Sequence, residues 1–114
     1  RSVKAIAKEI DVPVVALSQL NRASESRTTK RPVMADLRDS GALEQDADLI
    51  LFPFRPEVYD KTPETAGLAE IIVAKHRNGE TGKRKLHFAA RCAKFEDLAL
   101  DDPALTRPDD DWDE

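Results

Sequence analysis

The chain has 114 residues, which is enough for one compact domain and too few for two ordinary ones. Hydrophobic residues make up 40% of the sequence and charged residues 35%, so we expect a modest core beneath a highly charged surface. The apolar runs fall far short of the roughly 20 residues that cross a membrane. The single cysteine, Cys92, excludes a disulfide framework or a thiolate metal cluster built from this chain alone. These features predict a soluble, cytoplasmic protein whose thiol is buried or half-buried.

Charge is distributed unevenly along the chain. The net charge is −4, but the stretch from Glu96 to Glu114 holds nine acidic residues and one arginine, so the part before it is mildly basic. An acidic C-terminal stretch is typical of a disordered, solubilising tail and less often of a tail that docks a partner. We therefore divide the chain into a folded part, residues 1–98, and an acidic tail, residues 99–114. The basic body permits contact with nucleic acid without demonstrating it.

The first predicted elements are a helix and a buried strand. Apolar residues recur over residues 2–10 at the spacing of an amphipathic helix. The apolar, β-branched run over residues 12–17 predicts a strand that is buried on both faces of a parallel sheet. Polar residues 18–22 follow at the sheet edge where ligands bind in such folds, and residues 23–31 predict a mobile polar loop.

Helical turns and further strands follow. Asp36 is placed to cap a short helix from Leu37, Gly41 interrupts that helix, and residues 42–47 predict another helical turn. The further strands are predicted at residues 49–54, 69–76 and 84–90, with a hairpin turn at Asn78-Gly79 and a short edge strand over residues 95–100. The predicted fold class is α/β, with a mostly parallel core sheet, flanking helices and a C-terminal antiparallel hairpin. The first helix lacks a preceding strand, so the predicted sheet begins in the middle of an α/β unit.

Two features look like known sites without meeting their requirements. Residues 79–83 resemble the end of a phosphate-binding loop, but Arg84 stands where that motif has Ser or Thr, and a strand follows instead of a helix. We therefore interpret residues 79–83 as a plain hairpin turn. His76 and His87 lie on different predicted strands without metal-site spacing, so we predict no metal ligands.

Three side chains are candidates for contact with phosphate groups. Gln19 directly follows the first predicted strand, where its amide could contact a phosphate or a water; the alternative is that it satisfies loop backbone. Lys75 and Arg77 are two residues apart at a strand end and so project from one face. They could stabilise charge on a phosphoryl group across a subunit boundary, or form a solvated basic strand end.

A further candidate region lies between the predicted loop and the second helical turn. The run Arg38-Asp39-Ser40-Gly41 combines an arginine with backbone amides near a glycine, which suits contacts with the phosphates of a single nucleic-acid strand. Aromatic residues are scarce here, so base stacking is not supported and such contacts would be tolerant of sequence.

Several of these segments occur together in one known family. They are Val14-Val15-Ala16-Leu17-Ser18-Gln19-Leu20-Asn21-Arg22, Arg31-Pro32-Val33, residues 36–48 (Asp-Leu-Arg-Asp-Ser-Gly-Ala-Leu-Glu-Gln-Asp-Ala-Asp) and Lys75-His76-Arg77-Asn78-Gly79. In this order and spacing, the chain resembles the carboxyl-terminal part of the bacterial replicative DNA helicase, the DnaB family, over residues 1 to about 98. The resemblance implies part of a RecA-like ATPase domain.

The resemblance also implies an activity, its cofactors and its partners. Such helicases form a homo-hexameric ring around single-stranded DNA, bind ATP and Mg²⁺ at subunit interfaces, and use hydrolysis to move along the strand and unwind duplex. By resemblance, Gln19 senses the γ-phosphate, Arg77 is an arginine finger that reaches the neighbouring subunit's nucleotide, and Lys75 is its companion. Primase and a helicase loader are further implied partners. The residues that match the DNA-holding loop, or lie near it, are Arg38, Asp39, Gly41 and Arg22.

The chain departs from the family pattern in what it lacks. The phosphate-binding loop, the catalytic glutamate and the Mg²⁺-ordering aspartate of the family do not occur in these 114 residues. The sequence thus predicts one side of an interfacial active site, inactive alone and functional within a full-length helicase. The alternative is a catalytically inert short protein that binds single-stranded DNA or regulates a helicase ring.

Overall fold

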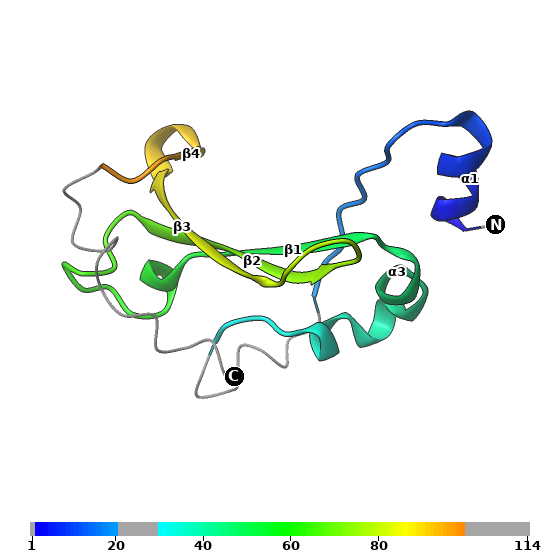
Figure 1. Cartoon of the computed structure of the whole chain (residues 1–114). Coiled ribbons are helices and arrows are strands. Elements are labelled where there is room, and N and C mark those ends of the chain that lie inside the picture. Colours follow the sequence, from blue (N-terminus) through cyan, green and yellow to red (C-terminus); the bar gives the residue numbers. More distant parts are fainter. Residues whose placement is uncertain (1, 21–29, 100–114) are drawn as a thin grey trace.

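The computed structural model describes residues 2–20 and 30–99. Figure 1 shows a curled sheet with short helices on one side of it and a further helix set apart near one end. The elements in chain order, with 3₁₀ helices labelled η, are α1 (Val3–Ile10), η1 (Met34–Ser40), α3 (Gly41–Asp46), β1 (Leu49–Phe54), η2 (Pro56–Val58), β2 (Leu68–His76), β3 (Gly82–Ala89), η3 (Ala90–Cys92) and β4 (Lys94–Glu96). Most of the predicted mobile loop and of the acidic tail lies outside the described residues.

The sheet has the order β1-β2-β3-β4, and each neighbouring pair is antiparallel. The predicted C-terminal hairpin is confirmed by β2 and β3, but the prediction of a mostly parallel core sheet is wrong for this structure. Parallel neighbours need a crossover, usually a helix, between them. The chain instead turns back from β1 to β2 through a loop that contains only η2, and the two strands pair directly.

Residues 12–17 are the main departure from the predicted elements. They form no strand, and their apolar side chains are exposed, with Val15 88% and Leu17 96% accessible. Their composition favours a strand, but a strand also needs a neighbour for its backbone groups. None of the described strands pairs with this segment, so the prediction of a buried strand is wrong here.

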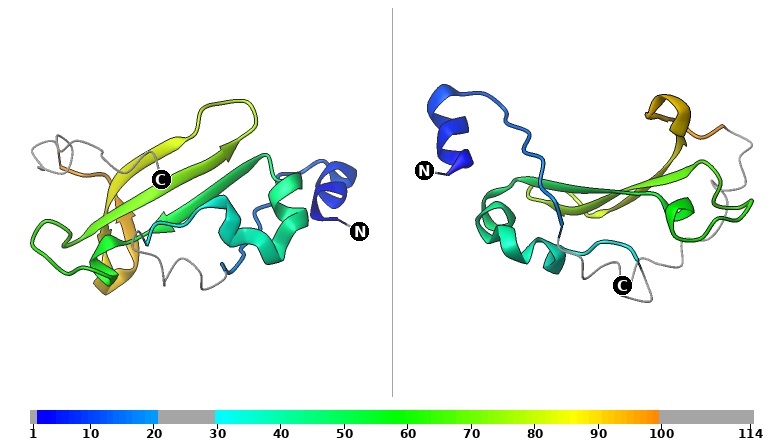
Figure 2. Two further views of the ribbon diagram at one scale, coloured as in Figure 1. Left: turned by 90° about the horizontal axis from the view of Figure 1, so that it is seen from below. Right: turned by 180° about the vertical axis from the view of Figure 1, so that it is seen from behind.

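The core lies on one face of the sheet. β1 alternates strictly, with Ile50, Phe52 and Phe54 buried and Leu49, Leu51 and Pro53 exposed. Leu37 of η1 packs with Ile50 and Phe52 to form the core cluster. The right-hand view of Figure 2 shows η1 and α3 together on one side of the sheet. The prediction of a strand over residues 49–54 is confirmed, although only one of its faces is covered.

Helix α1 follows the predicted amphipathic pattern. Ser2 caps its start, with its hydroxyl accepting a hydrogen bond from the Ala5 N–H (3.1 Å), and Asp11 ends it in the left-handed conformation (φ 56°). Its apolar residues Val3, Ile6 and Ile10 remain exposed. The helix therefore forms from its local sequence, without burial of its apolar face in the described part of the chain.

Two local predictions need correction. Asp36 does not cap a helix that starts at Leu37, because η1 already begins at Met34. The buried Asp36 carboxylate instead accepts a hydrogen bond from the Val33 N–H (2.9 Å), reaching back to the start of the helix as the third residue of a capping box does. Cys92 is exposed at the end of η3, so the prediction of a buried or half-buried thiol is wrong. The short edge strand predicted over residues 95–100 is present as β4, over Lys94–Glu96.

Within residues 2–20 and 30–99, the structure contains no helix long and apolar enough to cross a lipid bilayer.

Candidate functional site

An irregularity in the sheet lies next to the predicted Lys75 and Arg77 pair. Ile50 pairs with Lys75 while Leu51 pairs with Val73, so Ala74 is an extra residue on β2 and forms a β-bulge. A bulge breaks the alternation of faces and re-aims the side chains that follow it. Lys75 and Ala74 therefore both lie on the side of the sheet that carries the core, and Ala74 packs against the core there.

Arg77 is held by Asp48, the residue just before β1. The Arg77 backbone N–H donates to the Asp48 carbonyl (2.9 Å), which extends the pairing of β1 and β2 beyond Leu49 and His76. The Arg77 Nη1 lies 2.8 Å from Asp48 Oδ1. Two contacts, one between backbones and one between side chains, thus hold these residues together.

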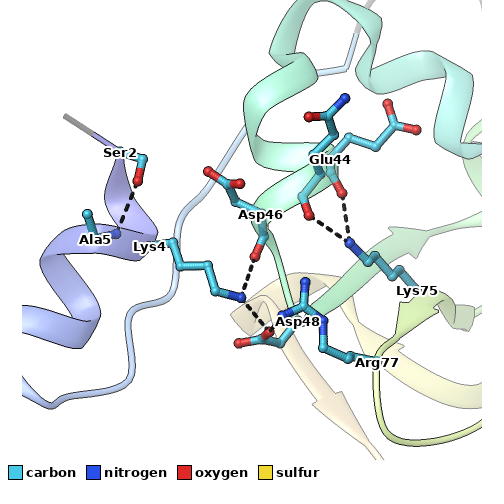
Figure 3. Close-up of polar contacts among 9 residues, drawn as sticks. Ser2, Lys4, Ala5, Glu44, Asp46, Asp48, Lys75 and Arg77 are labelled. Atoms are coloured by element: carbon cyan, nitrogen blue, oxygen red, sulfur yellow. Dashed lines mark hydrogen bonds and ion pairs between the residues drawn. The ribbon is translucent and has the colours of Figure 1, made fainter.

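Lys4 reaches the same carboxylate from α1. Its Nζ lies 2.9 Å from Asp48 Oδ1 and 3.1 Å from the Asp46 carbonyl oxygen (Figure 3). One carboxylate oxygen therefore meets an ammonium and a guanidinium. The hydrogen bond from Lys4, and then the positive charges of Lys4, Arg77 and Lys75, hold the pKa of Asp48 below its ordinary value. Asp48 stays ionised at neutral pH.

Lys75 binds a different part of the same segment. Its ammonium donates to the carbonyl oxygens of Glu44 (3.0 Å) and Gln45 (3.1 Å), near the C-terminal end of α3. Carbonyl groups in the last turn of a helix lack partners within it, and a cation satisfies them well. Figure 3 shows Lys75 and Arg77 directed at this stretch of chain, one toward α3 and the other toward Asp48.

The other predicted site residues are not part of this cluster. Gln19 is exposed in the extended chain after α1, and no hydrogen bond joins it to another described residue. Arg38 and Asp39 lie in η1, and Gly41 is the first residue of α3. Arg22 lies outside the described residues. Lys75 and Arg77 are therefore the predicted pair whose surroundings the structure defines in detail.

The turn that resembles a phosphate-binding loop has a different structure. Residues 77–81 join the antiparallel strands β2 and β3, as expected for a hairpin turn. Lys83 points into the protein, where its Nζ lies 3.8 Å from Oε1 of the buried Glu70. Glu70 also accepts hydrogen bonds from Arg31 Nε (2.9 Å) and Nη2 (2.7 Å). A lysine placed in this buried group of charges does not fit a phosphate cradle.

Two residues of the cluster were not identified from the sequence. Asp48 lies within the run 36–48, but its role depends on pairing with a strand that follows much later in the chain. Lys4 looked like an ordinary polar position of an amphipathic helix. Antiparallel pairing of residues 49–54 with residues 69–76 would have placed Asp48 opposite Arg77, and this is the signal that could have found it.

The similarity of the chain to known proteins defines its family. Residues 1–97 match the model of the DnaB-like helicase C-terminal domain, and the chain belongs to this family. It is 57% identical over 99 residues to the replicative DNA helicase DnaB of Pasteurella multocida. It is 58% identical over 99 residues to that of Haemophilus influenzae. Each comparison covers 87% of this chain and 21% of the relative, so the chain spans about a fifth of these proteins.

Solved structures agree with this assignment. A solved structure of a single ATPase domain matches with a TM-score of 0.79 and 48% identity, over 83% of this chain and 34% of that one. A DnaB-like replicative helicase, described with its interactions with primase, gives the same score and identity over 83% of this chain and 23% of its own. The RecA-like class predicted from the sequence is therefore supported, although the described sheet is antiparallel.

Proposed function

We propose that this chain is the C-terminal part of the ATPase domain of a hexameric replicative DNA helicase, which couples ATP hydrolysis to movement along single-stranded DNA and to duplex unwinding. The proposal rests on membership of the DnaB-like family and on one structural observation. Lys75 and Arg77, the cations at the end of β2, both contact residues 44–48, directly after the segment proposed to hold DNA.

Arg77 is the proposed arginine finger. Its side chain is 44% exposed, so the guanidinium is accessible although it is paired with Asp48. A guanidinium is always charged at neutral pH and binds phosphoryl oxygens through two parallel N–H groups. It is therefore suited to stabilise the charge that develops on the phosphoryl group of a nucleotide bound by the neighbouring subunit.

Lys75 links the end of β2, where Arg77 is proposed to contact the nucleotide, to α3, which follows the residues proposed to hold DNA. Its ammonium is bonded to carbonyls near the end of α3, and α3 begins at Gly41, in the proposed DNA-holding run with Arg38 and Asp39. A shift of the end of β2 would thus be passed to α3 through hydrogen bonds. Gln19 is the proposed γ-phosphate sensor, and Arg22 is proposed to lie near the DNA channel.

ATP and Mg²⁺ are proposed to be bound mainly by residues outside this chain. The described residues contain no group of three or more His, Cys, Asp or Glu side chains that could hold a metal ion. The hairpin turn before Lys83 does not fit nucleotide phosphates, whereas the cations Arg77 and Lys75 fit the outer side of such a site. ATP would supply the phosphoanhydride whose hydrolysis drives the movement.

The proposed partners follow from the same assignment. They are single-stranded DNA and further copies of the same protein in a homo-hexamer, with primase and a helicase loader docking through regions outside this chain. The relatives act in DNA replication, so we propose a cytoplasmic location.

The test uses a chimaera in which this chain replaces the matching 99 residues of the Haemophilus influenzae helicase, to which it is 58% identical. The unaltered chimaera should hydrolyse ATP and unwind a forked duplex. Arg77→Ala should lower the hydrolysis rate by roughly 10³- to 10⁵-fold, because an arginine finger contributes about that factor in other phosphoryl-transfer enzymes. Nucleotide binding, measured with a fluorescent ATP analogue, should stay nearly unchanged.

Arg91→Ala is the matched control. Arg91 is an exposed arginine in η3, at the far end of the sheet from Arg77 (Figure 1), and its removal should leave hydrolysis unchanged. Near-normal turnover in the Arg77→Ala chimaera would refute the assignment of the finger. An unaltered chimaera that binds single strands but hydrolyses no ATP would refute the proposed function itself.

A further inference from the structure

Asp48 connects three parts of the chain. Its Oδ1 meets Lys4 of α1 and Arg77 just after β2, and its own backbone leads from α3 into β1. The Asp48 side chain is 68% exposed and that of Arg77 is 44% exposed, whereas the Lys4 side chain is mostly covered, at 24%. Burial in the core therefore does not explain why Asp48 and Arg77 meet.

The pairing of Asp48 and Arg77 is part of the sheet geometry. Their backbones are joined by a hydrogen bond of 2.9 Å, so the two residues are cross-strand neighbours. Side chains at such positions leave the sheet about 5 Å apart on the same face. The ion pair of 2.8 Å then fixes one end of the guanidinium and limits the directions in which Arg77 can point.

Lys4 changes the charge balance of this arrangement. Lys4, Asp48 and Arg77 together carry one net positive charge, since one carboxylate is shared by two cations. Arg77 can therefore bind an anion through its other N–H groups while it keeps its contact with Asp48, because Lys4 also neutralises that carboxylate. A pair of Asp48 and Arg77 alone would be neutral and would attract an anion less.

We propose that Asp48 is a positioning residue for Arg77. Together with Lys4, it orients the guanidinium that follows β2 so that this group can contact the phosphoryl oxygens of a nucleotide bound by the neighbouring subunit. This inference rests on the proposed function, in which Arg77 is the finger. A side chain that is already aligned loses less freedom when it engages the reacting group. The contribution of Asp48 therefore lies in the rate at saturating ATP and not in ATP binding.

The experiment uses the hexameric chimaera with the isosteric variant Asp48→Asn, which removes the charge and keeps the size of the side chain. We expect kcat to fall about 10- to 100-fold, with KM for ATP changed less than about threefold. Asp48→Glu, which restores the charge, should recover activity to within about fivefold of the unaltered chimaera. Asp48→Ala is a second variant with the same expected loss as Asp48→Asn.

A double-mutant comparison separates positioning from general damage. In the Arg77→Ala background, with hydrolysis followed under single-turnover conditions, Asp48→Asn should cause no further loss, because the group that it positions is absent. Asp46→Asn is the matched control, since Asp46 contributes only its backbone carbonyl to Lys4. That variant should keep the kcat of the unaltered chimaera. Light scattering checks that every variant is a hexamer.

The outcomes separate this inference from the proposed function. If Arg77→Ala abolishes hydrolysis but Asp48→Asn does not lower kcat, the positioning role is overturned and the finger stands. An equal loss from Asp48→Asn in both backgrounds, or a change confined to KM, also overturns it. Normal turnover in Arg77→Ala overturns both.

Discussion

Glu57 illustrates how one side chain can hold a loop in place. Its Oε1 accepts a hydrogen bond from the Gly67 N–H (3.0 Å), and its Oε2 lies 3.0 Å from Arg55 Nη2. Gly67 has φ 71°, and a Cβ at this position would lie 2.9 Å from the His87 ring, so the loop requires glycine there. Glu57 thus joins the two ends of the connection between β1 and β2.

Stability should therefore depend on the ionisation of Glu57. The Gly67 N–H, and then Arg55, hold the pKa of Glu57 below its ordinary value of 4.5. A carboxyl with a lowered pKa stabilises the folded state above its unfolded pKa, and this stabilisation is lost as the pH falls through the folded value. We expect Glu57→Gln to cost about 1 kcal/mol at pH 7 and less at pH 3, because a larger fraction of the Glu57 carboxyl is protonated at the lower pH. Urea unfolding at the two pH values measures these free energies in a chimaera, in which this chain replaces the matching part of the solved ATPase domain that is 48% identical to it.

Glu64→Gln is the control for this prediction, because Glu64 is an exposed carboxylate of the same loop. Its variant should unfold like the unaltered chimaera at both pH values. A Glu57→Gln protein whose stability falls with acid as steeply as that of the unaltered protein would contradict the role given to Glu57.

At the scale of single residues, sequence spacing predicted the cations but not their partners. Lys75 and Arg77 were predicted from their separation on one strand, which is local information. Asp48 was not, because its contact with Arg77 depends on which strands pair. The contact of Lys4 with Asp48 spans 44 residues, and no local pattern encodes it.

At the scale of elements, residues 12–17 raise the sharpest question. They carry the composition of a buried strand but lie exposed in the described structure. The chain covers only 34% and 23% of the two solved structures that it matches, and we predict that a strand from outside these 114 residues pairs with this segment. The segment would then become a strand only when such a neighbour is present.

Hydrogen exchange of the backbone amides tests whether residues 12–17 become a paired strand when a neighbouring strand is present. In the isolated chain, the amides of residues 12–17 should exchange freely, since none of the strands in residues 30–99 pairs with them. In the Haemophilus influenzae chimaera they should slow by about 100-fold or more, as expected for paired core strands. Residues 68–76, which are paired in the described sheet, serve as the internal reference and should be protected in both proteins. Free exchange of residues 12–17 in the chimaera would show that they are not a core strand.

The elements that the sequence predicted correctly are those with strong local patterns. Helix α1 has a clear helical period and a serine cap, and the hairpin of β2 and β3 has a glycine-containing turn followed by alternating polar and apolar residues in β3. The direction of β1 relative to β2 could not be predicted in this way. A short apolar strand has the same composition in a parallel and an antiparallel pair, and only the connection distinguishes them.

At the scale of the whole molecule, the exposed apolar surface is the dominant feature. It includes residues of the extended segment, of β1 and of α1, namely Val12, Val14, Val15, Leu17, Leu49, Leu51, Ile6 and Ile10. Soluble monomers rarely expose apolar patches of this kind without a partner.

We therefore expect the isolated chain to self-associate. At micromolar concentration it should elute from a size-exclusion column as aggregates or exchanged oligomers, and the double variant Val15→Ser, Leu17→Ser should shift material toward the monomer. Val58→Ser is the control, because Val58 is an exposed valine on η2, close to where β1 ends (Figure 1). This variant should leave the elution profile unchanged. A sharp monomeric peak from the unaltered chain would contradict this expectation.

The ion pair of Arg31 and Glu70 has a consequence for the order of folding during synthesis. The two residues are 39 positions apart, so Arg31 emerges from the ribosome well before its acidic partner does. Until β2 emerges, the segment before η1 lacks the carboxylate that fixes it to the sheet. The segment that leads into the stretch proposed to face DNA is thus fixed to the sheet only after β2, the strand that Arg77 directly follows, has emerged.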